Sequence, residues 1–86
     1  MAYTVETTDT FEKEFEKHHR ERREWLKRMI IRLEENPEFG KSLRGRLSGL
    51  WQLQLGSFRV WYEINEEEKK VTLRAILHKD EAKRLY

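Results

Sequence analysis

The stretch that decides the fold is residues 49–64, GLWQLQLGSFRVWYEI, which has the pattern of a β-hairpin. Gly56 and Ser57 separate two apolar runs and form the Gly-X pair typical of a two-residue type II′ loop. Such a loop places Leu55 opposite Phe58. Because side chains alternate across a strand, six apolar residues then share one face, which we predict to be the core face: Trp51, Leu53, Leu55, Phe58, Val60 and Tyr62. A slip of one residue would expose all six, so the register is strongly specified.

The opposite face of the hairpin carries polar side chains and one tryptophan: Gln52, Gln54, Arg59, Trp61 and Glu63. We expect Trp61 to be covered by the C-terminal segment or by a partner, although an exposed tryptophan can also stack on a nucleic-acid base. The planar guanidinium of Arg59 is suited to holding a phosphate. The alternative is that Arg59 pairs with Gln54 or Glu63, an exposed interaction that contributes little to stability.

The residues before the hairpin predict one strand, residues 3–7, and two helices. Asp9 can cap a helix, and Glu12 three residues later completes a capping box. Apolar residues recur at helical spacing as far as Asn36-Pro37, where the residue before proline disfavours helix. One helix over this span would reach about 40 Å, whereas a compact domain of this size has a radius of gyration of about 12 Å. We therefore favour two antiparallel helices with a turn in residues 18–23 over a single long helix.

The residues after the helices complete the sheet. In the connecting segment 37–48, three apolar residues are expected to contact the core: Phe39, Leu43 and Leu47. Residues 71–77 are expected to form the third strand of a meander, with alternate residues on one face: Val71, Leu73, Ala75 and Leu77. Residues 79–86 fit a short terminal helix. The order β-α-α-β-β-β predicts an α+β fold, a single domain over residues 1–86 with a helical hairpin on one face of a mostly antiparallel sheet.

The composition limits the classes of function. The chain has 86 residues, 40% of them charged, with a formal net charge of +2 and no cysteine, which excludes disulfides and thiolate metal sites. His18 and His19 lack a third ligand, so we expect no metal site. No window approaches the roughly 18 apolar residues of a membrane span. The first residues are neither a signal nor a transit peptide, so we expect a soluble cytoplasmic protein with no membrane partner.

The charge is unevenly distributed along the chain. No acidic residue lies between Glu38 and Glu63, and this interval contains four basic residues: Lys41, Arg44, Arg46 and Arg59. We interpret the interval as an electrostatic footprint for phosphate, the alternative being a solvated loop with chance asymmetry. Gln52 and Gln54 can donate hydrogen bonds to phosphates or base edges but cannot neutralise charge, and they are also compatible with plain strand surface.

Three stretches, in this order, resemble the RelE/ParE superfamily of toxins of type II toxin–antitoxin systems. They are residues 43–51 (LRGRLSGLW), residues 56–64 (GSFRVWYEI) and residues 76–79 (ILHK). The order of predicted elements matches this superfamily over the whole chain, and the sequence similarity is concentrated in residues 43–79.

The resemblance implies a RelE-like mRNA interferase: a ribosome-dependent endonuclease that uses neither metal nor other cofactor. In this branch the ribose 2′-hydroxyl attacks the adjacent phosphate while basic side chains stabilise the developing charge. The implied partners are a cognate antitoxin, the ribosome and mRNA. Arg59 stands at the strand arginine of the family, and Lys79 at the basic position after the last strand. His78 is a further catalytic candidate because histidine titrates near neutral pH, and the remaining residues expected to bind RNA are Lys41, Arg44, Arg46, Gln52 and Gln54.

Two differences from the RelE pattern keep other functions open. RelE members usually carry basic residues where this chain has Gln52 and Gln54. They also often have a tyrosine shortly after the last strand, where the nearest here is Tyr86. A gyrase-inhibiting binding protein of the ParE kind, which shares the fold, is therefore an alternative. A degenerate toxin that retains only antitoxin binding is a third.

Overall fold

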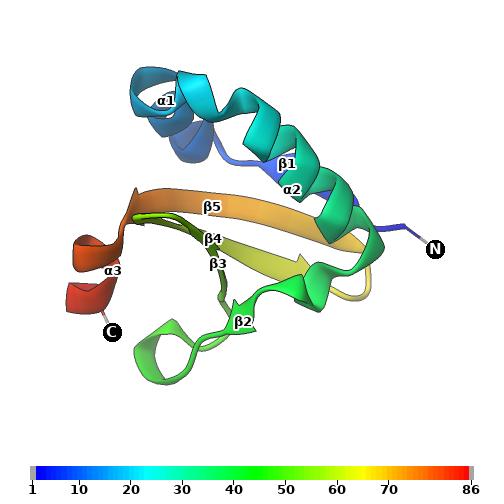
Figure 1. Ribbon diagram of the computed structural model, residues 1–86. Coiled ribbons are helices and arrows are strands. Elements are labelled where there is room, and N and C mark those ends of the chain that lie inside the picture. Colours follow the sequence, from blue (N-terminus) through cyan, green and yellow to red (C-terminus); the bar gives the residue numbers. More distant parts are fainter. Residues whose placement is uncertain (1, 86) are drawn as a thin grey trace.

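The strands form one five-stranded sheet, with two helices on one face and a short helix on the other (Figure 1). The computed structural model describes residues 2–85, so Met1 and Tyr86 lie outside the described residues. The elements in chain order are β1 (Thr4–Thr7), α1 (Asp9–His18), α2 (Arg23–Glu35), β2 (Lys41–Ser42), β3 (Trp51–Leu55), β4 (Phe58–Asn65), β5 (Lys70–His78) and α3 (Lys79–Leu85). The sheet order is β1-β5-β4-β3-β2, with β1 parallel to β5 and the other neighbours antiparallel. The α+β prediction is confirmed.

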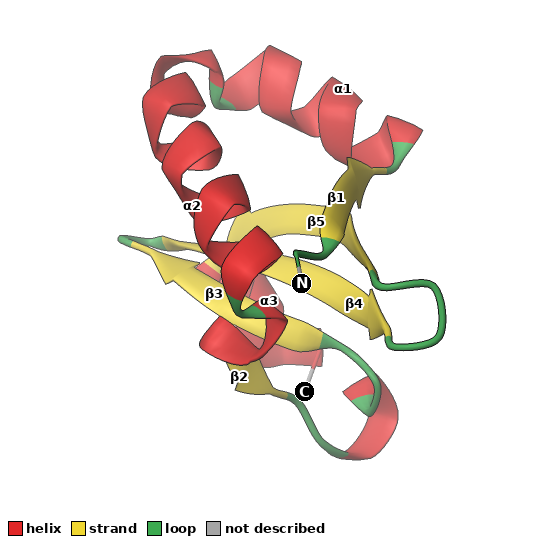
Figure 2. Ribbon diagram, turned by 90° about the vertical axis from the view of Figure 1, so that its right-hand side faces the viewer, coloured by secondary structure: helices red, strands yellow, loops and turns green. Residues whose placement is uncertain are grey.

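The helical hairpin covers one face of the sheet (Figures 1 and 2). A 3₁₀ turn at Arg20–Arg22 separates α1 from α2, inside the segment 18–23 where the sequence predicts a turn. Helix α2 ends at Glu35, directly before Asn36-Pro37, as expected. The radius of gyration is 12.3 Å, a compactness that a single helix across both segments would not permit.

The predicted cap of α1 is wrong by one residue. Thr8 is the N-cap: its backbone is extended, and its side-chain oxygen accepts a hydrogen bond from the Phe11 N–H at 3.1 Å. Asp9 is instead the first helical residue, where its carboxylate faces the positive end of the helix dipole. Glu12 does not complete a capping box, because its carboxylate accepts a hydrogen bond from the Thr7 hydroxyl.

The hairpin register is confirmed residue by residue. Leu55 pairs with Phe58, Gln54 with Arg59, and the pairing continues to Trp51 opposite Tyr62. Gly56 has a positive φ of 54°, which the first loop position of a type II′ turn requires. The main core lies between this sheet face and the helical hairpin, and its largest fully buried side chains are Tyr62, Phe11, Leu33, Leu73, Val60 and Val71.

Strand β5 departs from the predicted alternation. Trp61 pairs with Ala75 but Tyr62 pairs with Leu73, so Arg74 is an extra residue in β5. This β-bulge reverses which face the following side chains occupy. Ile76 therefore packs in the main core, whereas Ala75 and Leu77 face the opposite side of the sheet.

A second apolar cluster lies on that opposite side. Its buried members are Leu43, Trp61, Leu77 and Ala82. Helix α3 contributes Ala82, so the C-terminal segment covers Trp61, as the sequence analysis favours. Leu43 and Leu47 anchor the connecting segment to this second cluster rather than to the main core. The expectation for Phe39 is wrong: it is 45% exposed and lies under the guanidinium of Arg32.

The hydroxyl of Tyr62 fixes the chain just before β2. It donates a hydrogen bond to the Pro37 carbonyl at 2.8 Å and accepts one from the Gly40 N–H at 3.0 Å. The approach is so close that a Cβ on Gly40 would lie 2.6 Å from this hydroxyl and 2.6 Å from the Gln52 carbonyl oxygen. The contact determines where Lys41, the first residue of β2, meets the sheet edge.

Candidate functional site

A groove of about 510 Å³ lies on the sheet face opposite the helical hairpin. Strands β3 and β4 contribute its floor, β2 one rim and α3 the other. The side chains and backbone that line it are Lys41, Gln52, Gln54, Arg59, Lys79, Asp80, Ala82 and Lys83. Five of the residues that the sequence analysis assigns to the site therefore meet in one place: Lys41, Gln52, Gln54, Arg59 and Lys79.

The groove is strongly positive. Four of its residues are basic and only Asp80 is acidic. Within residues 2–85 none of the four basic side chains forms an ion pair, whereas several arginines and lysines of the helical hairpin pair with glutamates. A carboxylate oxygen of Asp80 lies 3.6 Å from Nδ1 of His78. The groove thus offers uncompensated positive charge to an anionic ligand.

Arg59 is oriented by the backbone of its own hairpin. Its Nη1 donates hydrogen bonds to the carbonyl oxygens of Gly56 at 3.0 Å and Phe58 at 2.9 Å. Within residues 2–85 its side chain forms no hydrogen bond or ion pair with the side chain of Gln54 or Glu63, and the Glu63 carboxylate forms an ion pair with Arg74 instead. The guanidinium carries five N–H donors, so Nε and Nη2 have no hydrogen-bond partner among residues 2–85 and remain available to a ligand.

Lys79 is held close to the same turn. Its backbone N–H donates to the Ser57 carbonyl at 2.7 Å, which ties the start of α3 to the hairpin loop. On the floor, the side-chain oxygen of Gln52 accepts a hydrogen bond from the Trp61 indole at 2.9 Å. The Gln52 amide is therefore oriented by Trp61, which α3 covers. Gln54 is exposed.

Three predicted site residues lie outside the groove. Arg44 and Arg46 are exposed on the segment between β2 and β3 and do not line it. His78 ends β5 next to the groove residue Asp80, whose backbone N–H donates to its Nδ1 at 3.2 Å. Its ring packs edge-on against Phe58, at 5.5 Å between centroids. Tyr86 lies outside the described residues.

Lys83 was not among the site residues predicted from the sequence. This residue lines the groove from α3, one helical turn after Lys79. Residues four apart on a helix lie on the same face, so the spacing of the two lysines was the available signal.

His19 has a structural role on the helical side. It is only 3% exposed, its ring lies 4.7 Å from that of Phe58, and its Nδ1 is 3.0 Å from Nη1 of Arg22. Burial first, and then the charge of Arg22, lower the pKa of His19. A neutral His19 accepts the hydrogen bond from Arg22, and Arg22 also stacks over Phe58. The turn between the helices is thereby joined to the tip of the β3–β4 hairpin.

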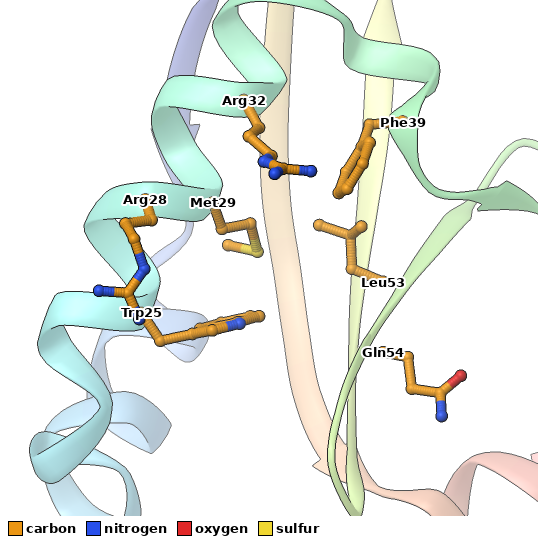
Figure 3. Close-up of a pocket in the computed structure, with 7 residues that line it drawn as sticks. All are labelled: Trp25, Arg28, Met29, Arg32, Phe39, Leu53 and Gln54. Atoms are coloured by element: carbon orange, nitrogen blue, oxygen red, sulfur yellow. The ribbon is translucent and has the colours of Figure 1, made fainter.

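An apolar pocket of about 290 Å³ opens between α2 and the edge of β3 (Figure 3). Trp25, Met29, Phe39 and Leu53 surround it, and Gln54 points away toward the other side of the strand. The remaining lining residues, Arg28 and Arg32, project from α2, and neither forms an ion pair within residues 2–85. The pocket therefore combines apolar walls with positive charge.

Residues 2–85 contain no group of three or more His, Cys, Asp or Glu side chains placed to hold a metal ion. No helix in the same range has the length and apolar character needed to cross a membrane.

The chain is similar to known toxins in both sequence and structure. A family model described as the ParE toxin of type II toxin–antitoxin system, parDE, matches residues 5–83. A double mutant of the E. coli toxin RelE in the free state is 30% identical, with a TM-score of 0.76 over 100% of this chain and 92% of that one. The toxin–antitoxin complex RelBE2 from Mycobacterium tuberculosis contains a chain that is 26% identical, with a TM-score of 0.81 over 91% of this chain and 99% of that one.

An archaeal relative extends the similarity. The RelE–RelB complex from Pyrococcus horikoshii OT3 has a chain that is 25% identical, with a TM-score of 0.70 over 92% of this chain and 97% of that one. Comparison with curated proteins found no match. The family model and the 30% identical RelE toxin each span nearly the whole fold, groove included. The chain therefore belongs to the RelE/ParE superfamily, as a toxin of a RelBE-like type II toxin–antitoxin system.

Proposed function

We propose that this toxin is an endoribonuclease that cuts mRNA on the ribosome, in the cytoplasm, with the groove on the outer sheet face as its RNA site. The observation that carries the proposal is the convergence on one groove of four basic side chains that form no ion pair within residues 2–85: Lys41, Arg59, Lys79 and Lys83. A single-stranded RNA backbone is a polyanion that such a groove attracts.

The groove residues suit a reaction in which the protein stabilises the negative charge that develops on a phosphate and supplies no nucleophile of its own. The 2′-oxygen of a ribose attacks the adjacent phosphorus, the bond to the 5′-oxygen of the next nucleotide breaks, and a 2′,3′-cyclic phosphate results. The 2′-hydroxyl proton leaves to a base and the departing 5′-oxygen gains a proton. We assign Arg59 the role of holding the pentacoordinate phosphate. Two hydrogen bonds to its own hairpin orient the guanidinium and leave Nε and Nη2 without a partner within residues 2–85, which supports this assignment.

Two residues are candidates for proton transfer. Asp80 is a carboxylate in the groove, and His78 contacts it from the end of β5. We keep His78 as a predicted acid–base residue beside Asp80, and Lys79, which lies between them in the sequence, as a predicted catalytic cation. Arg44 and Arg46 stay predicted contacts to RNA outside the groove.

Ribosome-programmed mRNA cleavage, read by primer extension, tests the proposal. We expect Arg59→Ala to lower the cleavage rate by about 10² to 10³, the usual cost of removing a donor from a transition-state charge. Arg59→Lys should restore only part of the rate, since an ammonium cannot form the planar two-point contact. Arg84→Ala is the matched control, because Arg84 is exposed on α3 and does not line the groove. Equal cleavage by all four proteins would remove Arg59 from the site.

Gyrase inhibition is the second candidate function. It is favoured by the ParE family match over residues 5–83 and by the uncharged Gln52 and Gln54 on the groove floor. Incorporation of labelled amino acid and labelled thymidine after induction separates the two. An early fall in thymidine incorporation while translation continues would favour gyrase inhibition. If neither falls, the chain is a degenerate toxin that only binds antitoxin.

We further propose a cognate antitoxin as the partner of the apolar pocket between α2 and β3. Two of the similar structures are toxin–antitoxin complexes from M. tuberculosis and P. horikoshii. The walls of Trp25, Met29 and Leu53 with Arg28 and Arg32 at the rim fit a segment with apolar and acidic side chains. Arg28→Glu should weaken antitoxin binding in calorimetry while leaving RNA cleavage by the free toxin unchanged, and unchanged antitoxin affinity would contradict the assignment.

A further inference from the structure

Three of the four cations of the groove come from its rims, the fourth is Arg59 on β4, and none comes from β3. Strand β3 presents the amides of Gln52 and Gln54, whereas the ammonium groups come from β2 and α3. Helix α3 alone contributes two of them, Lys79 and Lys83, four residues apart and therefore on one face. Between them Ala82 is only 2% exposed against the cluster that contains Trp61, so packing sets where this face lies.

We propose that Lys83 is a phosphate-binding residue for single-stranded RNA, and that α3 supplies through Lys79 and Lys83 the charge that β3 lacks. This inference rests on the proposed function, since it names a ligand of the same RNA. Lys83 lines the groove together with Arg59 and forms no ion pair or hydrogen bond within residues 2–85. Its next neighbour Arg84 does not line the groove.

The position of Lys83 makes its charge effective. A phosphate in a groove of this size lies within a Debye length, roughly 8 Å at physiological salt, of the side chains that line it. The flexible stem of a lysine can follow a phosphate without a fixed hydrogen-bond geometry. Lys83 therefore adds affinity and charge stabilisation, whereas Arg59 is the residue with the orientation of a fixed clamp.

Four variants of the 86-residue chain test this inference in the ribosome-programmed cleavage assay. We expect Lys83→Ala to lower the cleavage rate by at least about tenfold. This loss is smaller than the loss expected on removing a fully sheltered donor, because the Lys83 side chain is exposed. Lys83→Arg should retain most of the rate, and Arg84→Ala, with the same loss of charge on the same helix, should retain all of it. Adding Gln54→Lys to Lys83→Ala should recover part of the loss, since it returns a cation to the same groove from its floor.

A binding measurement makes the outcome independent of cleavage. The probe is a single-stranded 2′-O-methyl RNA, which lacks the attacking hydroxyl. The slope of log affinity against log salt is negative, and it should become less negative by about 0.7 in Lys83→Ala, the change for one lost phosphate contact to a single strand. In Arg84→Ala the slope should stay constant.

The results separate the two proposals. If wild type cleaves mRNA but Lys83→Ala behaves like Arg84→Ala in both assays, the role of Lys83 is refuted and the endonuclease stands. If wild type does not cleave, the endonuclease proposal falls, and the salt slopes still decide whether Lys83 contacts phosphate. A wild type that neither cleaves nor binds the RNA would overturn both.

Discussion

Tyr62→Phe should destabilise the fold more than its single lost oxygen suggests. The Tyr62 side chain is fully buried, and its hydroxyl bridges the Pro37 carbonyl and the Gly40 N–H. Phenylalanine fills the same space, so no cavity opens. The change instead leaves a buried carbonyl and a partly buried amide without partners, and each such group costs about 1 to 3 kcal/mol. Allowing for partial relaxation near Gly40, we expect a loss of about 2 to 4 kcal/mol.

Urea denaturation at neutral pH measures this loss, with thermal unfolding as a second readout. In a domain of this size each kcal/mol shifts the melting temperature by about 4 to 8 °C, so the expected decrease is roughly 8 to 32 °C. Tyr3→Phe is the matched control. The Tyr3 hydroxyl donates to Glu66 at the protein surface, and its removal should cost less than about 1 kcal/mol.

The difference in stability loss between the two tyrosine variants tests the anchoring role of the Tyr62 hydroxyl. If Tyr62→Phe loses no more stability than Tyr3→Phe, the two buried hydrogen bonds do not anchor the segment before β2. The position of Lys41 at the groove rim would then need another explanation. If the loss is large, RNA affinity should also fall modestly, because Lys41 directly follows the detached segment.

Three further predictions concern the same contacts. Burial raises the pKa of Tyr62 to about 12. The neutral phenol therefore contributes fully to folding stability below pH 10, and this contribution is lost as pH rises toward 12. In urea titrations, Tyr62→Phe should lose less stability than wild type between these two pH values. The pKa of His19 is lowered by burial and by Arg22. The contribution of neutral His19 to folding stability is therefore complete above pH 6.5 and decreases as pH falls through the lowered value. His19→Asn keeps an acceptor for Arg22 and should remove this acid dependence of stability, whereas His18→Asn, at an exposed position, should not. Gly40→Ala should cost about 1 to 3 kcal/mol by overpacking. The double variant with Tyr62→Phe should cost less than the sum of the two single losses, because the Tyr62 hydroxyl is one of the two atoms that lie 2.6 Å from the new Cβ; strict additivity would contradict this.

Local patterns were sufficient to predict the hairpin register, the helices and every strand except the two-residue β2, which lies inside the predicted connecting segment 37–48. Residues 49–64 have one face that must be buried, and the Gly56 loop has a defined geometry, so only one pairing satisfies both. The end of α2 was likewise predictable from adjacent residues, because the residue before Pro37 disfavours helix. The cap of α1 was missed by one residue because Thr8 and Asp9 are both good capping residues and sequence pattern does not rank neighbours.

Tertiary structure decided which side chains share a surface. The bulge at Arg74 reverses the faces of Ala75, Ile76 and Leu77, and no residue pattern within β5 marks it. Lys83 enters the groove, and His78 stays beside it, because α3 packs on Trp61 through Ala82 rather than on the helical hairpin. The sequence by itself determined the helices, four of the five strands and the basic character of the hairpin, since these depend on neighbours along the chain. Strand β2 was not predicted, because its two residues are defined by their pairing with β3. The composition of the groove depends instead on the packing of α3, which buries Ala82 against Trp61, about twenty residues earlier in the chain. The hydrophobic free energy of this contact is gained only once the sheet has formed.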